Sequence, residues 1–133
     1  MREMKFRGKH TELGGNWVYG SLVVCDNGDC LIGTCKEYGP EAQYMRNEVY
    51  PDSVGQYTGL KDVNDKEIYE GDIVAEHGHY VKSDRVLYQK IQWKESYSCW
   101  LRGEFQRLTP KNIKQYKIEV VGNIYDDKEL LLL

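Results

Sequence analysis

The sequence predicts a mainly β protein, folded as a small antiparallel barrel or sandwich. Short segments rich in Val, Ile, Tyr and Trp recur along the chain, and these residue types favour strands. Turn signals built from Gly, Pro, Asn and Asp separate the segments at short intervals. No long stretch keeps the apolar period of about 3.6 residues that is typical of a helix. With 133 residues, the chain is one domain, or one domain with an appended hairpin region.

The first predicted elements are two strands joined by a hairpin turn. Residues 16–24 are rich in strand-forming side chains, and Gly20 among them marks a bulge or a close approach of two backbones. The dipeptide Asn27-Gly28 is typical of a two-residue hairpin turn, after which residues 31–34 return as the next strand. The pattern of residues 41–50 is ambiguous.

The rest of the chain predicts further strands and one short helix. Thr109 and Pro110 form a helix-start signal, with Thr as the N-cap and Pro at the first helical position. One or two helical turns then reach Ile113, and Asp126 is expected to cap a final turn through residues 129–131. The expected strands cover residues 54–57, 73–75, 86–93, 97–101 and 117–125.

Composition and charge predict a water-exposed surface and no membrane span. Charged residues make up 29% of the sequence, and the formal net charge of −3 favours no class of partner. No segment approaches the ~18 apolar residues that would span a membrane. The N-terminus is charged from Arg2 onward and lacks an apolar run, so we expect no signal peptide and a cytoplasmic protein. Residues 130–133 are expected to pack against the body of the protein or against another subunit.

The chain contains four cysteines, and their spacing matches no common zinc pattern, which uses CxxC-type pairs. A two-residue turn at Asn27-Gly28 would place Cys25 opposite Cys30. In a reducing cytoplasm we expect free thiols that pack as small hydrophobes, with a metal site and a disulfide as the alternatives. The four are Cys25, Cys30, Cys35 and Cys99.

Acidic residues and histidines provide the candidates for catalysis. Paired carboxylates can hold Mg²⁺ for phosphodiester cleavage. The structural alternative is that these acidic residues lie in polar turns, where most are solvated, and that Asp72 accepts hydrogen bonds from turn amides. His77 and His79 flank Gly78 and could chelate a metal, but no third ligand accompanies them. No nucleophile elbow or phosphate-cradling loop occurs, so we expect no enzyme and no cofactor. The acidic cluster consists of Asp62, Asp65, Glu67, Glu70 and Asp72.

Charge is distributed unevenly along the chain. Residues 36–72 contain 4 basic and 9 acidic residues, whereas residues 81–119 contain 9 basic and 4 acidic ones together with several aromatics. Cations that alternate with aromatic rings are typical of a nucleic-acid-binding surface, on which the cations contact phosphates and the rings stack on bases. The alternative is that the rings face the core and the cations face water; the acidic and basic segments could also attract each other between subunits. The candidate binding residues are Lys82, Arg85, Lys90, Trp93, Lys94, Trp100, Arg102 and Arg107.

Five phrases of the sequence resemble the YopX-like family of small phage and prophage proteins. They are residues 1–7, residues 15–20, residues 54–62, the phrase Ile-Tyr-Glu-Gly-Asp-Ile-Val at 68–74, and residues 119–125 followed by Glu129-Leu130-Leu131. The resemblance implies an SH3-like β-barrel over residues 54–133, preceded by an N-terminal β-hairpin region over residues 1–53. It also implies phage or prophage origin, and it supplies no catalytic residues.

These observations together predict a non-catalytic binding or assembly module that acts inside an infected bacterium. The expected partner is a host or phage protein, or a second copy of the chain, and not a membrane. The alternative is a nucleic-acid-binding module that uses residues 81–119, and a further alternative is a metal-dependent hydrolase that uses Asp62 or Asp72.

Overall fold

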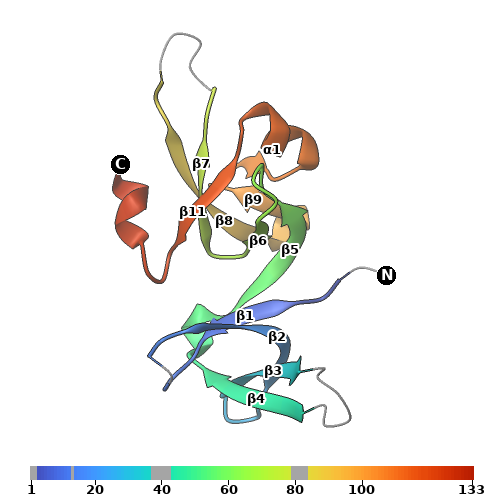
Figure 1. The fold of residues 1–133 in the computed structure, drawn as a ribbon. Coiled ribbons are helices and arrows are strands. Elements are labelled where there is room, and N and C mark those ends of the chain that lie inside the picture. Colours follow the sequence, from blue (N-terminus) through green and yellow to red (C-terminus); the bar gives the residue numbers. More distant parts are fainter. Residues whose placement is uncertain (1–2, 13, 37–42, 79–83) are drawn as a thin grey trace. The chain divides into compact units, whose positions relative to one another are not determined.

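The computed structural model describes residues 3–12, 14–36, 43–78 and 84–133. They form two antiparallel sheets with one short α-helix, which confirms the mainly β class (Figure 1). The chain divides into two compact units, Met1–Tyr57 and Thr58–Leu133. The strand β5 (Gly55–Lys61) begins in the first unit and ends in the second.

The first unit is a curled sheet of hairpin-connected strands. Its strands lie in the order β4-β3-β2-β1-β5, and every neighbouring pair is antiparallel. The short helix η1 (Pro51–Ser53) leads from β4 into β5. The strand bounds are β1 Phe6–Lys9, β2 Trp17–Val24, β3 Cys30–Lys36 and β4 Gln43–Val49, so the ambiguous residues 41–50 contain a strand.

One face of this sheet builds the core of the first unit. Cys30, Ile32 and Val49 are buried there, and Phe6, Val18, Leu22 and Val54 pack against them. Gly20 lies where β2 approaches β3, and a Cβ at this position would collide with the backbone carbonyl oxygen of Gly33. The close approach expected at Gly20 is therefore confirmed, because no side chain fits between the two strands.

The turn between β2 and β3 differs from the expected two-residue form. The amide of Gly28 donates to the Cys25 carbonyl oxygen at 2.9 Å, and the amide of Cys25 donates to the Asp29 carbonyl oxygen at 2.8 Å. Gly28 has φ +93°, whereas Asn27 is not among the residues with positive φ, so the turn is a three-residue loop that ends in a left-handed glycine. The Asn27 side chain stabilises this loop by accepting the Asp29 amide at 3.0 Å.

The changed turn also changes the register of the cysteines. Val24 lies opposite Cys30, and Cys25 is shifted to a position beside Asp29. The prediction that Cys25 lies opposite Cys30 is therefore wrong. Cys25, Cys30 and Cys99 are free thiols, whereas the Cys35 side chain lies outside the described part of the chain.

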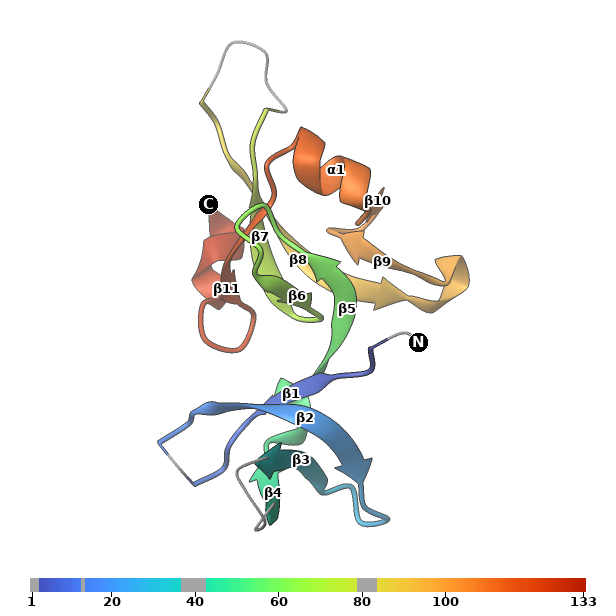
Figure 2. The ribbon, with the colours of Figure 1, turned by 45° about the vertical axis from the view of Figure 1, so that its right-hand side comes forward.

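The second unit contains a five-stranded antiparallel sheet and the hairpin of β5 with β6 (Figures 1 and 2). The order of the five strands is β10-β9-β8-β7-β11. The strand pairings found among the described residues leave this order open, without closure into a barrel. The bounds are β6 Glu67–Tyr69, β7 Asp72–Glu76, β8 Leu87–Lys94, β9 Cys99–Arg102, β10 Gln106–Arg107 and β11 Glu119–Asn123.

Three short helices complete the second unit. The helix α1 (Pro110–Gln115) starts as expected, because the Thr109 side chain accepts the amide of Asn112 at 3.1 Å. The 3-10 helices are η2 (Glu95–Tyr97) and η3 (Lys128–Leu132). Asp126 does not cap the final turn as expected; Asp127 holds the N-cap position, and its carboxylate instead accepts the amide of Asn123 at 3.1 Å.

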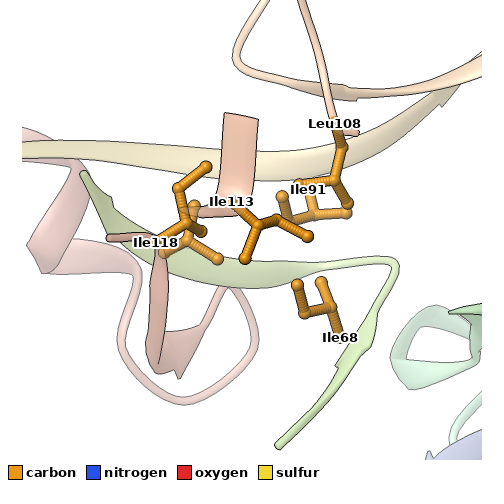
Figure 3. Close-up of a cluster of buried hydrophobic side chains, with 6 residues drawn as sticks. Ile68, Ile91, Leu108, Ile113 and Ile118 are labelled. Carbon is orange, nitrogen blue, oxygen red and sulfur yellow. The ribbon is translucent and has the colours of Figure 1, made fainter. Parts of the chain in front are cut away.

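The core of the second unit lies between its sheet and α1 (Figure 3). Val74 comes from β7, Ile91 from β8 and Ile113 from α1, and Ile118 directly precedes the edge strand β11. Leu60, Trp100, Tyr116 and Val120 pack around this cluster. The core is completed by Ile68 from β6 and Leu108, which precedes α1.

Candidate binding surfaces

The pairing of β8 with β9 divides the predicted binding residues between two faces of the sheet. Trp93 lies opposite Trp100, whereas Lys94 lies opposite Cys99. Because successive side chains of a strand point to opposite faces, Lys90 and Lys94 lie on the face away from the two tryptophans. The segment is basic and aromatic in sequence, but its two paired tryptophans and these two lysines do not form one surface.

The two tryptophans form a pair of which one member is partly accessible. Their ring centroids lie 5.1 Å apart with an interplanar angle of 68°, a T-shaped arrangement that aromatic pairs favour. Trp100 packs against the core of the second unit, whereas Trp93 is 40% exposed. Only Trp93 of the pair therefore offers a large apolar area to a partner.

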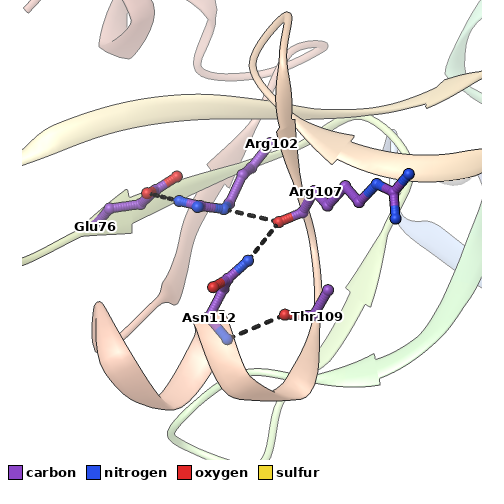
Figure 4. Close-up of polar contacts among 5 residues, drawn as sticks. All are labelled: Glu76, Arg102, Arg107, Thr109 and Asn112. Carbon is purple, nitrogen blue, oxygen red and sulfur yellow. Dashed lines mark hydrogen bonds and ion pairs between the residues drawn. The ribbon is translucent and has the colours of Figure 1, made fainter. Parts of the chain in front are cut away.

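Arg102 was expected at the surface, and the structure corrects this expectation (Figure 4). Only 2% of Arg102 is exposed, and its guanidinium forms an ion pair with buried Glu76 on β7. Its Nε donates to the carbonyl oxygen of Arg107 at 3.0 Å, and its guanidinium lies 4.9 Å from the ring centroid of Tyr116. A cation held in this way joins β7, β10 and the end of α1 and is not placed to contact a partner.

The remaining predicted cations are scattered. Arg107 and Lys94 are exposed, and Lys90 is half-buried. Arg85 is exposed and lines a small open hollow with His77, Gly78 and Asp84. Lys82 and His79 lie outside the described residues.

The two carboxylates considered for metal chemistry, those of Asp62 and Asp72, accept hydrogen bonds from backbone amides. Asp62 is buried, and its oxygens accept three backbone amides, among them that of Val120 at 2.8 Å. Asp72 accepts the amide of Tyr69 at 2.7 Å, as expected for a side chain suited to bonding turn amides. The ring of His77 lies 3.3 Å from the Glu119 carboxylate. Within the described ranges, no group of three or more His, Cys, Asp and Glu side chains is placed to hold a metal ion.

Exposed large apolar side chains occur along the whole described chain, and several of them fall within residues 121–133, of which the sequence marked only residues 130–133. β11 is the edge strand of its sheet and carries a bulge between Val120 and Gly122. The segment that follows it leads into η3, which packs near β8. The exposed side chains of this C-terminal segment are Val121, Ile124, Tyr125, Leu132 and Leu133.

Comparison with known proteins identifies the fold and the family. No helix of the described chain is long and apolar enough to cross a membrane. Protein EF1440 from Enterococcus faecalis has a similar crystal structure, with a TM-score of 0.62 and 22% sequence identity over 98% of this chain and 99% of that chain. This likeness shows the fold alone. No curated protein matches the chain. The model of the YopX protein family matches residues 5–132, and the chain therefore belongs to the YopX family.

Proposed function

We propose that this protein is a non-catalytic binding and assembly module that self-associates through its C-terminal segment. The observation that supports this role is the exposure of large apolar side chains there. Leu132 is 87% exposed, and Tyr125 and Val121 are each more than 40% exposed. Apolar side chains gathered at one part of a surface are typical of protein–protein contacts.

Burial of these exposed apolar side chains would favour association. Complete burial of one Leu or Val side chain contributes about 1.5–3 kcal/mol before the entropic cost of association is subtracted. A second copy of the same segment, related by twofold symmetry, would present the same side chains in a self-complementary arrangement. Ile124 and Leu132 would then be shielded from water in both copies.

The contact is expected to use side chains and not strand pairing. β11 is an edge strand, but its bulge interrupts the regular ladder, and the amide of Val120 already donates to Asp62. Bulges and engaged backbone groups protect an edge from pairing with another chain. The proposed dimer therefore packs the segment after β11 and not its edge.

The proposed setting is the one that the resemblance to the family implies. We propose that the protein is encoded by a phage or prophage and acts in the cytoplasm of the bacterial host. We also propose an SH3-like barrel for the second unit. Its antiparallel strands around a single core, with a short helix before the last strand, support that arrangement.

Sedimentation velocity of the full chain over a range of concentrations tests self-association. The parent is expected to form dimers, and the double variant Ile124→Ser with Leu132→Ser is expected to remain monomeric at the same concentration. Phe105→Ser is the matched control, because Phe105 is 79% exposed in the same unit but lies between β9 and β10. A parent that stays monomeric at every concentration would contradict self-association.

If the parent is monomeric, the remaining possibility is that the C-terminal segment binds a different protein. A tagged pull-down from bacterial lysate, with and without nuclease treatment, then separates the candidates. A protein retained after nuclease treatment by the parent, but lost with Ile124→Ser and Leu132→Ser, would assign the C-terminal segment to that partner. Material lost on nuclease treatment would point to nucleic acid.

A further inference from the structure

The sheet of the first unit has one face that packs the core, and its opposite face carries cations and rings together with Val23 and Leu31. Side chains alternate between the faces of a strand, and Phe6, Val18 and Ile32 belong to the face that packs the core. The residues between them point the other way. We call the following set the basic face: Lys5, Arg7, Lys9, Trp17, Tyr19 and Arg46.

The register of β1 and β2 places cations beside rings. Arg7 lies opposite Tyr19, and Lys9 lies opposite Trp17. The Arg7 guanidinium lies 4.8 Å from the ring centroid of Trp17, and the Lys9 ammonium lies 5.8 Å from the same centroid. Both cations are within the ~6 Å at which an aromatic ring attracts a positive charge. The strand register and these contacts therefore hold the cations of β1 next to the aromatic rings of β2.

Several members of the basic face are accessible. Tyr19 is 46% exposed and Arg46 is exposed, whereas Lys9 and Trp17 are half-buried. Arg7 is 7% exposed, so its main effect is to hold the ring of Trp17 in place. The accessible members are those that a ligand would contact.

Negative charge lies mainly elsewhere in the first unit. Asp26 and Asp29 belong to the turn between β2 and β3, and Asp52 belongs to η1. Glu3 forms an ion pair with Lys5 at 3.1 Å, and Glu48 lies on the same side of β4 as Arg46. The face thus carries more positive than negative charge, although the formal net charge of the chain is −3.

We propose that the basic face binds single-stranded nucleic acid. Lysine and arginine contact phosphates, and flat rings stack on bases, which a single strand leaves accessible and a duplex does not. An acidic polypeptide would contact Lys9 and Arg46 but would make no use of the Tyr19 ring. This ligand site is distinct from the C-terminal segment, so either proposal can fail without the other.

Fluorescence anisotropy of the full chain with labelled oligothymidylate and oligouridylate of about 15 nucleotides tests the proposal, the two probes separating DNA from RNA. Affinity is expected to fall as salt rises. The double variant Lys9→Ala with Arg46→Ala should reduce the slope of log affinity against log salt by about 1.4, because each phosphate contact on a single strand contributes ~0.7. Lys111→Ala with Lys114→Ala removes the same charge from exposed positions of α1 and should leave the slope unchanged.

Substitutions of the ring test stacking separately from charge. Tyr19→Ala should weaken binding about tenfold, whereas Tyr19→Phe keeps the ring and should bind like the parent. Ile124→Ser with Leu132→Ser should also bind like the parent, which separates this site from self-association. Circular dichroism establishes that each variant is folded. Equal competition by polyglutamate, tighter binding of a duplex of the same length, or no binding at low salt would overturn the proposal.

Discussion

The Asp62 carboxylate accepts the backbone amide of Val120 at 2.8 Å, although 58 positions separate the two residues. The amides of Asn64 and Lys66 donate to the other oxygen of the same carboxylate at 2.8 and 2.9 Å. Asp62 is buried, so these backbone amides take the place of the water that would solvate its charge. One side chain thereby joins the turn between β5 and β6 to the edge strand β11.

Asp62→Ala is expected to lower the free energy of unfolding by about 3 kcal/mol, because three backbone amides lose a buried, charged acceptor together. Urea denaturation followed by circular dichroism measures this change. Asp62→Asn should cost less, since its amide oxygen still accepts hydrogen bonds. Glu129→Ala removes an exposed carboxylate from the same unit and should change the free energy by less than about 0.5 kcal/mol. A similarly small effect of Asp62→Ala would contradict the role assigned to this carboxylate.

Glu76 and Arg102 form a buried pair, so we expect the effect of substituting one of them on the free energy of unfolding to depend on whether the other is present. Arg102→Met should lower the free energy of unfolding by about 3–5 kcal/mol, because it leaves the Glu76 charge buried without the opposite charge of the guanidinium. Adding Glu76→Leu should recover much of that loss, since the pair is then replaced by apolar side chains. A double-mutant cycle measured in urea gives the coupling, and additive losses would show that the two side chains act independently.

The strands that the sequence predicted are those whose apolar content is high. Residues 16–24 and 86–93 were expected and correspond to β2 and β8, and the Thr109 cap fixed the start of α1. The strand β1 was not expected, because Phe-Arg-Gly-Lys has one apolar side chain and its cations point to the basic face. A short strand with one charged face gives almost no apolar pattern.

The candidate binding residues were chosen by charge along the chain, which does not reveal the faces of a strand. Alternation in β8 separates Trp93 from Lys94, and burial removes Arg102 from the surface. A partial signal was present, because Arg102 is two positions from Trp100 and so shares its face. Its partner Glu76 is 26 positions away, and only the fold brings the two together.

Gly20→Ala is expected to destabilise the first unit, because the new methyl group would meet the backbone carbonyl oxygen of Gly33. Backbone cannot move aside as a flexible side chain does, so we expect a loss of about 3 kcal/mol or more. Amide hydrogen exchange followed by mass spectrometry should show faster exchange in β2 and β3. Ser21→Ala, an exposed change in the same strand, should leave the exchange of both strands unaltered.

The left-handed backbone conformation of Lys117, which follows α1, predicts that glycine at this position stabilises the protein. Lys117 has φ +45°, and the amide of the next residue, Ile118, donates to the Ile113 carbonyl oxygen at 3.0 Å. This is the helix ending in which a left-handed residue, usually glycine, is followed by an apolar contact, here between Ile113 and Ile118 in the core. Lys117→Gly should raise the free energy of unfolding by about 1 kcal/mol, because a side chain with this φ costs ~1–2 kcal/mol and glycine avoids it.

The control for Lys117→Gly is the same change inside the helix. Lys114 is exposed and lies within α1, where glycine is disfavoured by about 1 kcal/mol relative to alanine. Lys114→Gly should therefore lower the free energy of unfolding while Lys117→Gly raises it, although both remove one lysine. Urea denaturation of the two variants side by side measures the difference. Opposite signs would show that backbone conformation, and not the loss of charge, sets the result, whereas equal losses would exclude the left-handed strain at Lys117.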